Sequence, residues 1–125
     1  MKRLGVISCS AMLTLCALAV APGRVSADQH RDSNVRTVEV VAKEFAFVPS
    51  KIAVEPGSTV TIKLINKGSL SHNLHIAGKG MKTETIQSGN TDTVTVTAPE
   101  NGKLEFFCNV PGHRQAGMTG AIVTR

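Results

Sequence analysis

The sequence predicts an all-β domain of seven or eight short strands. Apolar and polar residues alternate with a period of two along most of the chain after residue 36, and no window shows the apolar stripe of an amphipathic helix. Clusters of Gly, Pro, Asn and Ser separate the alternating stretches. Such alternation is typical of strands with one buried face. Short strands at this spacing indicate a β-sandwich or a barrel.

The expected strands follow the alternating stretches in order. Between residues 59 and 64, for example, Val60, Ile62 and Leu64 alternate with threonines and a lysine. The same reasoning gives strands at residues 37–40, 51–55, 59–64, 93–97, 103–106 and 120–124. Turn-forming residues stand between them at positions 56–57, 66–68, 78–80, 88–90 and 99–102.

Residues 1–27 have the features of a secretory signal peptide. Lys2 and Arg3 give a positive start, residues 4–21 are mostly apolar and uncharged, and Val25-Ser26-Ala27 resembles a cleavage site. We therefore expect one exported domain, residues 28–125, in the periplasm or another extracytoplasmic space. After removal of the leader we expect no stable membrane insertion, and we expect the small domain to be a monomer.

Charge and cysteine content exclude some classes of function. The formal charge is +5, but three basic residues lie in the leader, so the mature domain carries only +2. It has no basic run interleaved with aromatic residues, so nucleic-acid binding has no support. Cys108 is the one cysteine outside the leader, so no intramolecular disulfide is expected. A single exported cysteine indicates intermolecular pairing, a free thiol or a metal.

Residues 108–118 carry three metal-donor types at equal spacing. Cys108, His113 and Met118 are five residues apart, and a Pro-Gly pair and a later glycine let the chain turn between them. A further imidazole, His72, lies upstream. Two imidazoles, one thiolate and a weak axial thioether are the ligands of a mononuclear blue-copper site. The sequence therefore predicts one copper ion that cycles between Cu(II) and Cu(I).

Strand parity predicts which histidine faces the site. Cys108 has the parity of the apolar residues in the strand before it, and His72 has the parity of Leu74 and Ile76. Alternate side chains of a strand point to opposite faces, so Cys108 and His72 are expected inside. His75 has the opposite parity and is expected to face solvent.

Zinc and catalysis fit these residues less well. A thioether is a poor fourth ligand for zinc, which prefers Cys, His or carboxylate. A Cys108–His113 pair could act as a nucleophile and base, but the parity buries the thiol, and no acidic residue lies near His113 in sequence. We therefore do not expect an enzyme.

The motifs resemble those of the cupredoxin, or blue copper, family over nearly all of residues 35–125. The Cys-His-Met spacing is most similar to the auracyanins and rusticyanins, and the family also includes plastocyanins and azurins. The resemblance rests on Phe45-Ala-Phe47-Val-Pro49, on Val54-Glu-Pro-Gly57-Ser-Thr-Val60, on Asn66-Lys-Gly68, on Ser71-His72-Asn73, and on residues 107–113 and 117–120.

The resemblance implies a two-sheet Greek-key β-sandwich. It also implies that Asn73 ties the two ligand-bearing segments together by hydrogen bonds. Azurins have a glycine before the first histidine, whose carbonyl approaches the metal; Ser71 stands there in this chain, which leaves a fifth ligand open. The implied copper ligands are His72, Cys108, His113 and Met118.

The expected function is one-electron transfer between transient redox partners of the cytochrome or oxidase kind. Docking is expected at the edge of His113, over small or apolar neighbours. The alternative is a copper chaperone or buffer that passes on metal; the spare donors for that role, Met81 and His75, are isolated. The residues expected to flank His113 are Pro111, Gly112, Ala116, Gly117 and Met118.

Overall fold

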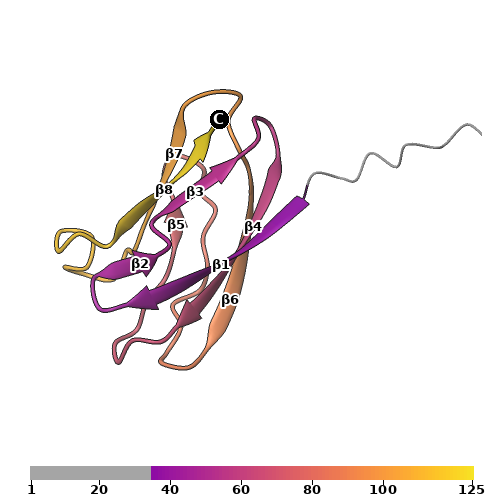
Figure 1. The fold of residues 1–125 in the computed structure, drawn as a ribbon. Coiled ribbons are helices and arrows are strands. Elements are labelled where there is room, and N and C mark those ends of the chain that lie inside the picture. The colour runs from indigo at the N-terminus through magenta and orange to yellow at the C-terminus, as the bar shows by residue number, and fades with distance from the viewer. Residues whose placement is uncertain (1–34) are drawn as a thin grey trace, which may run out of the picture.

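The computed structural model describes residues 35–125, in which eight strands form two facing sheets (Figure 1). One sheet has the order β2-β1-β4-β6 and the other β3-β8-β7-β5. This confirms the predicted all-β sandwich. The strands are β1 Val35–Lys43, β2 Ala46–Val48, β3 Lys51–Val54, β4 Thr59–Asn66, β5 His75–Ile76, β6 Thr91–Thr97, β7 Lys103–Phe107 and β8 Thr119–Thr124.

The predicted leader, residues 1–27, and the start of the predicted mature domain, residues 28–34, lie outside the described residues. Within residues 35–125, no helix is long and apolar enough to cross a membrane.

Strand β4 is one of the two inner strands of the first sheet, and its burial pattern follows the alternation in its sequence. Every second residue, including Val60, Ile62 and Leu64, is buried, and the residues between them are partly exposed. It pairs in parallel with β1 and antiparallel with β6, so both its edges are satisfied. The alternation therefore gives one apolar face, which packs on the second sheet.

The two sheets meet around Phe106 of β7. Its ring lies edge-on to Phe47 of β2, with 5.4 Å between ring centroids. Gly120 of β8 pairs with Phe106, and a side chain at Gly120 would collide with the Phe106 ring and with the Ser50 carbonyl. The glycine therefore makes room for the Phe106 ring in the core.

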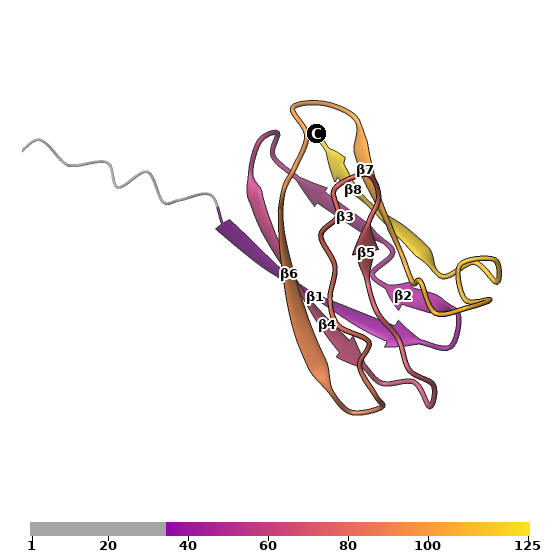
Figure 2. The ribbon, with the colours of Figure 1, turned by 180° about the vertical axis from the view of Figure 1, so that it is seen from behind.

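Strand β2 is not among the strands expected from the sequence; it has three residues and pairs with the end of β1. Strand β5 falls within residues 72–76, where the parity argument assumes a strand, but it has only two residues, which pair with the end of β7. Segments this short show almost no alternation, so their place depends on the neighbouring strand. Both adjoin the end of the sandwich where the turn after β1 and the loop after β7 lie side by side (Figure 2).

Candidate metal centre

Three of the four predicted ligands converge inside this end of the sandwich. The side-chain donor atoms of His72, Cys108 and His113 all lie within 4.8 Å of one another. The Nδ1 atoms of the two histidines are 3.2 Å apart, and Cys108 Sγ is 3.6 Å from His113 Nδ1. All three residues are buried, and Met118 is fully buried as well.

These separations fit donors around one metal ion. Metal–nitrogen and metal–sulfur bonds of about 2.0–2.3 Å place neighbouring donors roughly 3–4 Å apart around the ion. The donors are a thiol and two imidazoles, with a thioether in the same loop, and this mixture suits copper in both oxidation states. The residues present therefore fit a type 1 copper ion.

The loop from Cys108 to Met118 is closed by its own backbone. Cys108 N–H donates to the Met118 carbonyl at 3.1 Å, and Met118 N–H donates to the His113 carbonyl at 3.1 Å. Gly112 and Gly117 have φ values of 83° and 102°, a region that favours glycine. The tight turns thus hold the three predicted ligands of this loop in one compact unit.

His72 comes from a different segment, which is anchored to Ile86. The backbones of His72 and Ile86 exchange two hydrogen bonds, of 3.1 and 2.9 Å. Asn66, at the end of β4, is fully buried; its side-chain amide donates to the carbonyls of Leu70 and Ile86, and its side-chain oxygen Oδ1 accepts the Gly68 N–H. The asparagine therefore fixes the loop that leads to His72.

Asn73 joins the two ligand-bearing segments. Its side-chain oxygen accepts the backbone N–H of Asn109 at 2.7 Å, and its amide donates to the Thr85 hydroxyl at 2.9 Å. This confirms the role that the family resemblance implied for Asn73. Because Asn109 directly follows Cys108, the bond holds His72 and the thiol in register.

The far nitrogen of His72 and the carboxylate of Glu44 lie on the outer side of the site. His72 Nε2 is buried and has no hydrogen-bond partner among the described residues. Burial, and then the neighbouring His113, lower the pKa of His72, while Glu44 acts in the opposite direction. Backbone N–H groups, chiefly that of Ser69, lower the pKa of Glu44. The neutral imidazole that a metal requires is therefore favoured.

Phe45 covers His113, a contact that the sequence reasoning did not anticipate. The two rings are edge-to-face, with 5.3 Å between centroids, and Phe45 is 43% exposed. Phe45 has a φ of 59°, which is unusual for a residue with a side chain. Part of the surface expected at His113 is therefore an aromatic ring from the turn between β1 and β2.

The expected apolar surface needs one correction. Pro111, Gly112, Ala116 and Gly117 are exposed as predicted, but Met118 is fully buried and cannot belong to it. A buried Met118 matches its expected role as a ligand better than a surface role.

His75 points away from the donor cluster, as parity predicted, but it is partly covered. Its ring lies over Phe107, with 5.7 Å between centroids, and burial lowers its pKa, with Lys82 adding to the effect. The guanidinium of Arg114 stacks on the same Phe107 ring at 4.0 Å. The expectation of a solvent-facing His75 is thus only half met, because cross-strand packing covers one side of the ring.

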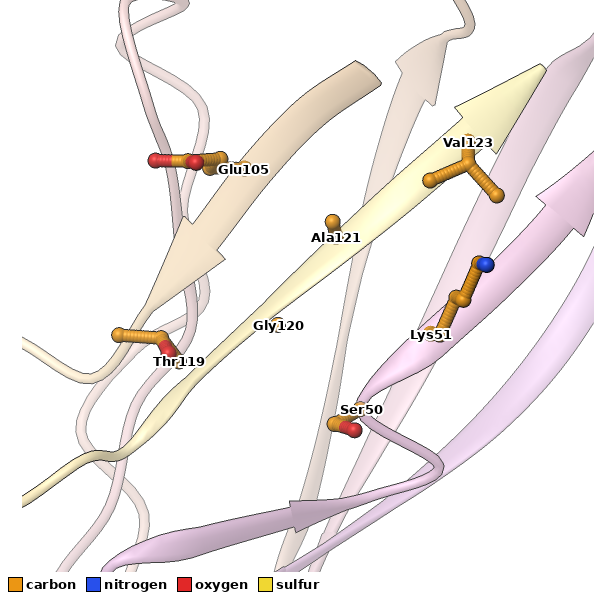
Figure 3. Close-up of a pocket in the computed structure, with 7 residues that line it drawn as sticks. All are labelled: Ser50, Lys51, Glu105, Thr119, Gly120, Ala121 and Val123. Carbon is orange, nitrogen blue, oxygen red and sulfur yellow. The ribbon is translucent and has the colours of Figure 1, made fainter.

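A shallow hollow lies elsewhere, on the outer face of β3, β8 and β7 (Figure 3). Lys51 and Glu105 stand at its sides, and Gly120 and Ala121 form its floor. It contains no cluster of metal donors. The chemistry of the described residues is therefore concentrated in the buried cluster.

The comparisons with known proteins agree with this geometry. The model of the cupredoxin-like domain family matches residues 10–123. The chain belongs to this family. Its fold is also similar to auracyanin A, a "blue" copper protein from Chloroflexus aurantiacus, with 25% identity, a TM-score of 0.64, and coverage of 73% of this chain and 99% of that one.

Two curated relatives carry different descriptions. Plastocyanin of Fritillaria agrestis is 34% identical, in an alignment that covers 84% of this chain and 67% of the plastocyanin. The copper-resistant cuproprotein CopI of Pseudomonas aeruginosa is 26% identical, in an alignment that covers 72% of this chain and 76% of CopI. Neither name is that of an enzyme. The fold alone is shared with part of a multicopper oxidase (TM-score 0.60, 38% of that chain covered).

Proposed function

We propose that this cupredoxin is a type 1 copper protein that carries single electrons outside the cytoplasm. The observation that carries the proposal is the buried convergence of one thiol and two imidazoles, with Met118 in the same loop. The copper ligands are His72, Cys108, His113 and Met118. Bound copper supplies reversible one-electron chemistry, and soft sulfur donors together with imidazoles suit both of its oxidation states.

The residues around the donors favour electron transfer in two ways. They exclude water, because Cys108 and His72 are fully buried and His113 is only 6% exposed. They also hold the donors in place through backbone bonds within the loop and through Asn73. A site held in this way changes little between the two oxidation states, so each transfer requires little reorganisation.

The docking surface of this proposal is the exposed end of the molecule around His113. Phe45 is packed on the His113 ring, and Pro111, Gly112 and Ala116 are exposed in the adjoining loop. Transient redox encounters use small interfaces. We propose a cytochrome-like or oxidase-like partner that docks there briefly.

A second function, copper buffering or delivery, is favoured by one observation, the similarity to proteins named copper-resistant cuproproteins. The two functions differ in what leaves the protein: an electron in the first and the metal in the second.

The test uses the copper-loaded mature domain. An electron carrier should be intensely blue when oxidised, lose the colour on reduction by a cytochrome in a stopped-flow instrument, and regain it fully on reoxidation in the presence of a Cu(I) chelator. A buffer should lose its copper to the chelator in the reduced state. Colour that does not return would therefore favour copper delivery. Absence of any blue species would contradict the type 1 site and electron transfer, and absence of copper binding would contradict both functions.

A further inference from the structure

The outward nitrogen of His72 lacks an acceptor. Its Nδ1 faces the other donors, so Nε2 carries the hydrogen when Nδ1 binds a metal. Nε2 is buried and has no hydrogen-bond partner within residues 35–125. A buried N–H without an acceptor loses its hydrogen bond to water and gains none in return, which is destabilising. Metal-binding histidines almost always donate this hydrogen to a carboxylate, a carbonyl or water.

Gly68 leaves a space that borders both this nitrogen and a carboxylate. A Cβ at Gly68 would lie 2.8 Å from His72 Nε2 and 2.6 Å from Glu44 Oε1. The two polar atoms are therefore separated by no more than these two distances together. Such a separation is spanned by a direct hydrogen bond after a small rotation, or by one bridging water.

The carboxylate of Glu44 is fixed in this position by the same loop. The backbone N–H groups of Ser69 and Leu70 both donate to Oε1. These bonds hold Oε1 beside Gly68, and the carboxylate has further lone pairs that can accept from the histidine or from a bridging water. Glu44 directly follows β1, and Phe45, which covers His113, is the next residue.

We propose that Glu44 is a positioning residue of the copper centre, which accepts the outward N–H of His72 directly or through one water. A carboxylate partner makes the imidazole a stronger donor and so stabilises Cu(II) relative to Cu(I). This inference rests on the proposed copper function. In it, Gly68 is the residue whose missing side chain lets the carboxylate and the imidazole approach each other.

The first experiment compares the reduction potentials of copper-loaded wild type and Glu44→Gln. Glutamine keeps an oxygen that can accept the Ser69 and Leu70 N–H groups but lacks the negative charge. Loss of a hydrogen-bonding partner beyond the ligands typically weakens metal binding by 10–100-fold. We expect the affinity for Cu(II) relative to Cu(I) to fall about tenfold, which raises the potential by about 59 mV for one electron.

Glu100→Gln is the matched control. It removes the same charge from the loop between β6 and β7, beside Gly57, at the opposite end of the sandwich. It should shift the potential far less than Glu44→Gln. Equal shifts in both variants would overturn the proposal, since they would show only the general effect of removing one negative charge and no specific contact between Glu44 and His72.

Gly68→Ala tests the same contact from the other side. The added methyl occupies the space between the carboxylate and the imidazole, so the potential should rise although Glu44 is still present. Adding Glu44→Gln to it should cause no further rise, because both changes remove one interaction. Additive shifts would contradict the proposal; if Gly68→Ala does not fold, the comparison with Glu100→Gln decides alone.

Failure of this inference and failure of the proposed function are distinguishable. A reversible copper signal at an unchanged potential in Glu44→Gln would refute only the role of Glu44. A wild-type protein without reversible copper chemistry would refute the function itself.

Discussion

The two segments that supply the predicted ligands are built in different ways. Residues 108–118 contribute three of them within one loop, which is closed by hydrogen bonds between its own backbone groups. Residues 66–73 contribute only His72, and this segment is held by Asn66, by the bridge to Ile86 and by Asn73. The first segment organises itself locally, whereas the second depends on contacts between distant parts of the chain.

This difference indicates that the two segments have different roles at the site. The loop fixes the identity and spacing of the donors, so changes within it should alter the chemistry directly. The His72 segment fixes the position of one donor relative to the others, so changes there should alter stability and potential first. The following variants test that division.

The largest expected effect is that of Cys108→Ala. The intense blue absorption of a type 1 site depends on the copper–thiolate bond, so the variant should lose the colour completely. The measurement is the visible spectrum after addition of Cu(II) to the apo domain. A Cys108→Ala protein that is still blue would show that the loop 108–118 does not supply the thiolate ligand.

The next largest effects are expected from variants in the His72 segment, and they concern the free energy of unfolding of the protein. Asn66→Ala removes three hydrogen bonds and leaves the buried Gly68 N–H without its acceptor, although the Ile86 carbonyl still accepts the His72 N–H; this should cost about 3 kcal/mol in the free energy of unfolding. Asn73→Ala removes two hydrogen bonds and should cost about 2 kcal/mol. Both values can be measured by denaturant unfolding of the apo protein.

The effects of these two variants on the copper spectrum should have the opposite order of size. Asn73 connects the two segments, so its loss should perturb the copper spectrum more than the loss of Asn66, which acts within one segment. If Asn66→Ala perturbs the spectrum more, His72 is held mainly by its own loop and not by the link to Asn109.

Smaller effects are expected from Met118, the weak axial donor. Met118→Gln should lower the reduction potential, because an oxygen donor stabilises Cu(II) better than a thioether. Met118→Leu should raise it, because loss of the donor favours Cu(I). Shifts on the order of 59 mV correspond to a tenfold change in relative affinity.

Met81→Leu is the control for Met118, because Met81 is 42% exposed and lies between β5 and β6, outside the loop 108–118. Its potential should equal that of the wild type. Voltammetry with both Met118 variants unchanged would show that the thioether is not axial.

Features of the fold and the site that depend on local sequence pattern can be predicted from the sequence. Alternation along β4 and β7 gave the two-sheet fold and the inward direction of Cys108, and equal spacing singled out the loop 108–118. What it missed depends on contacts between distant residues. Phe45 meets His113, and Glu44 reaches the loop at Ser69, across long stretches of sequence. Nothing near Glu44 in the sequence indicates either contact.

The smallest expected effect on the site is that of His75→Ala. His75 lies three residues from His72 but on the opposite face of the chain, against Phe107. The variant should keep the copper spectrum, whereas His72→Ala should lose it. A bleached His75→Ala protein would mean that the ligand assignment is wrong.

Protonation of His75 should instead affect how the free energy of unfolding depends on pH. Burial, with Lys82 adding to it, lowers the pKa of His75 in the folded protein. The unfolded state then binds more protons, so the folded state loses stability as the pH falls through the histidine range, from about 7 to about 5. The free energy of unfolding of apo His75→Ala should therefore fall less steeply over this range than that of the apo wild type. Equal slopes would mean that the ring is freely solvated, and that its packing on Phe107 does not affect its protonation.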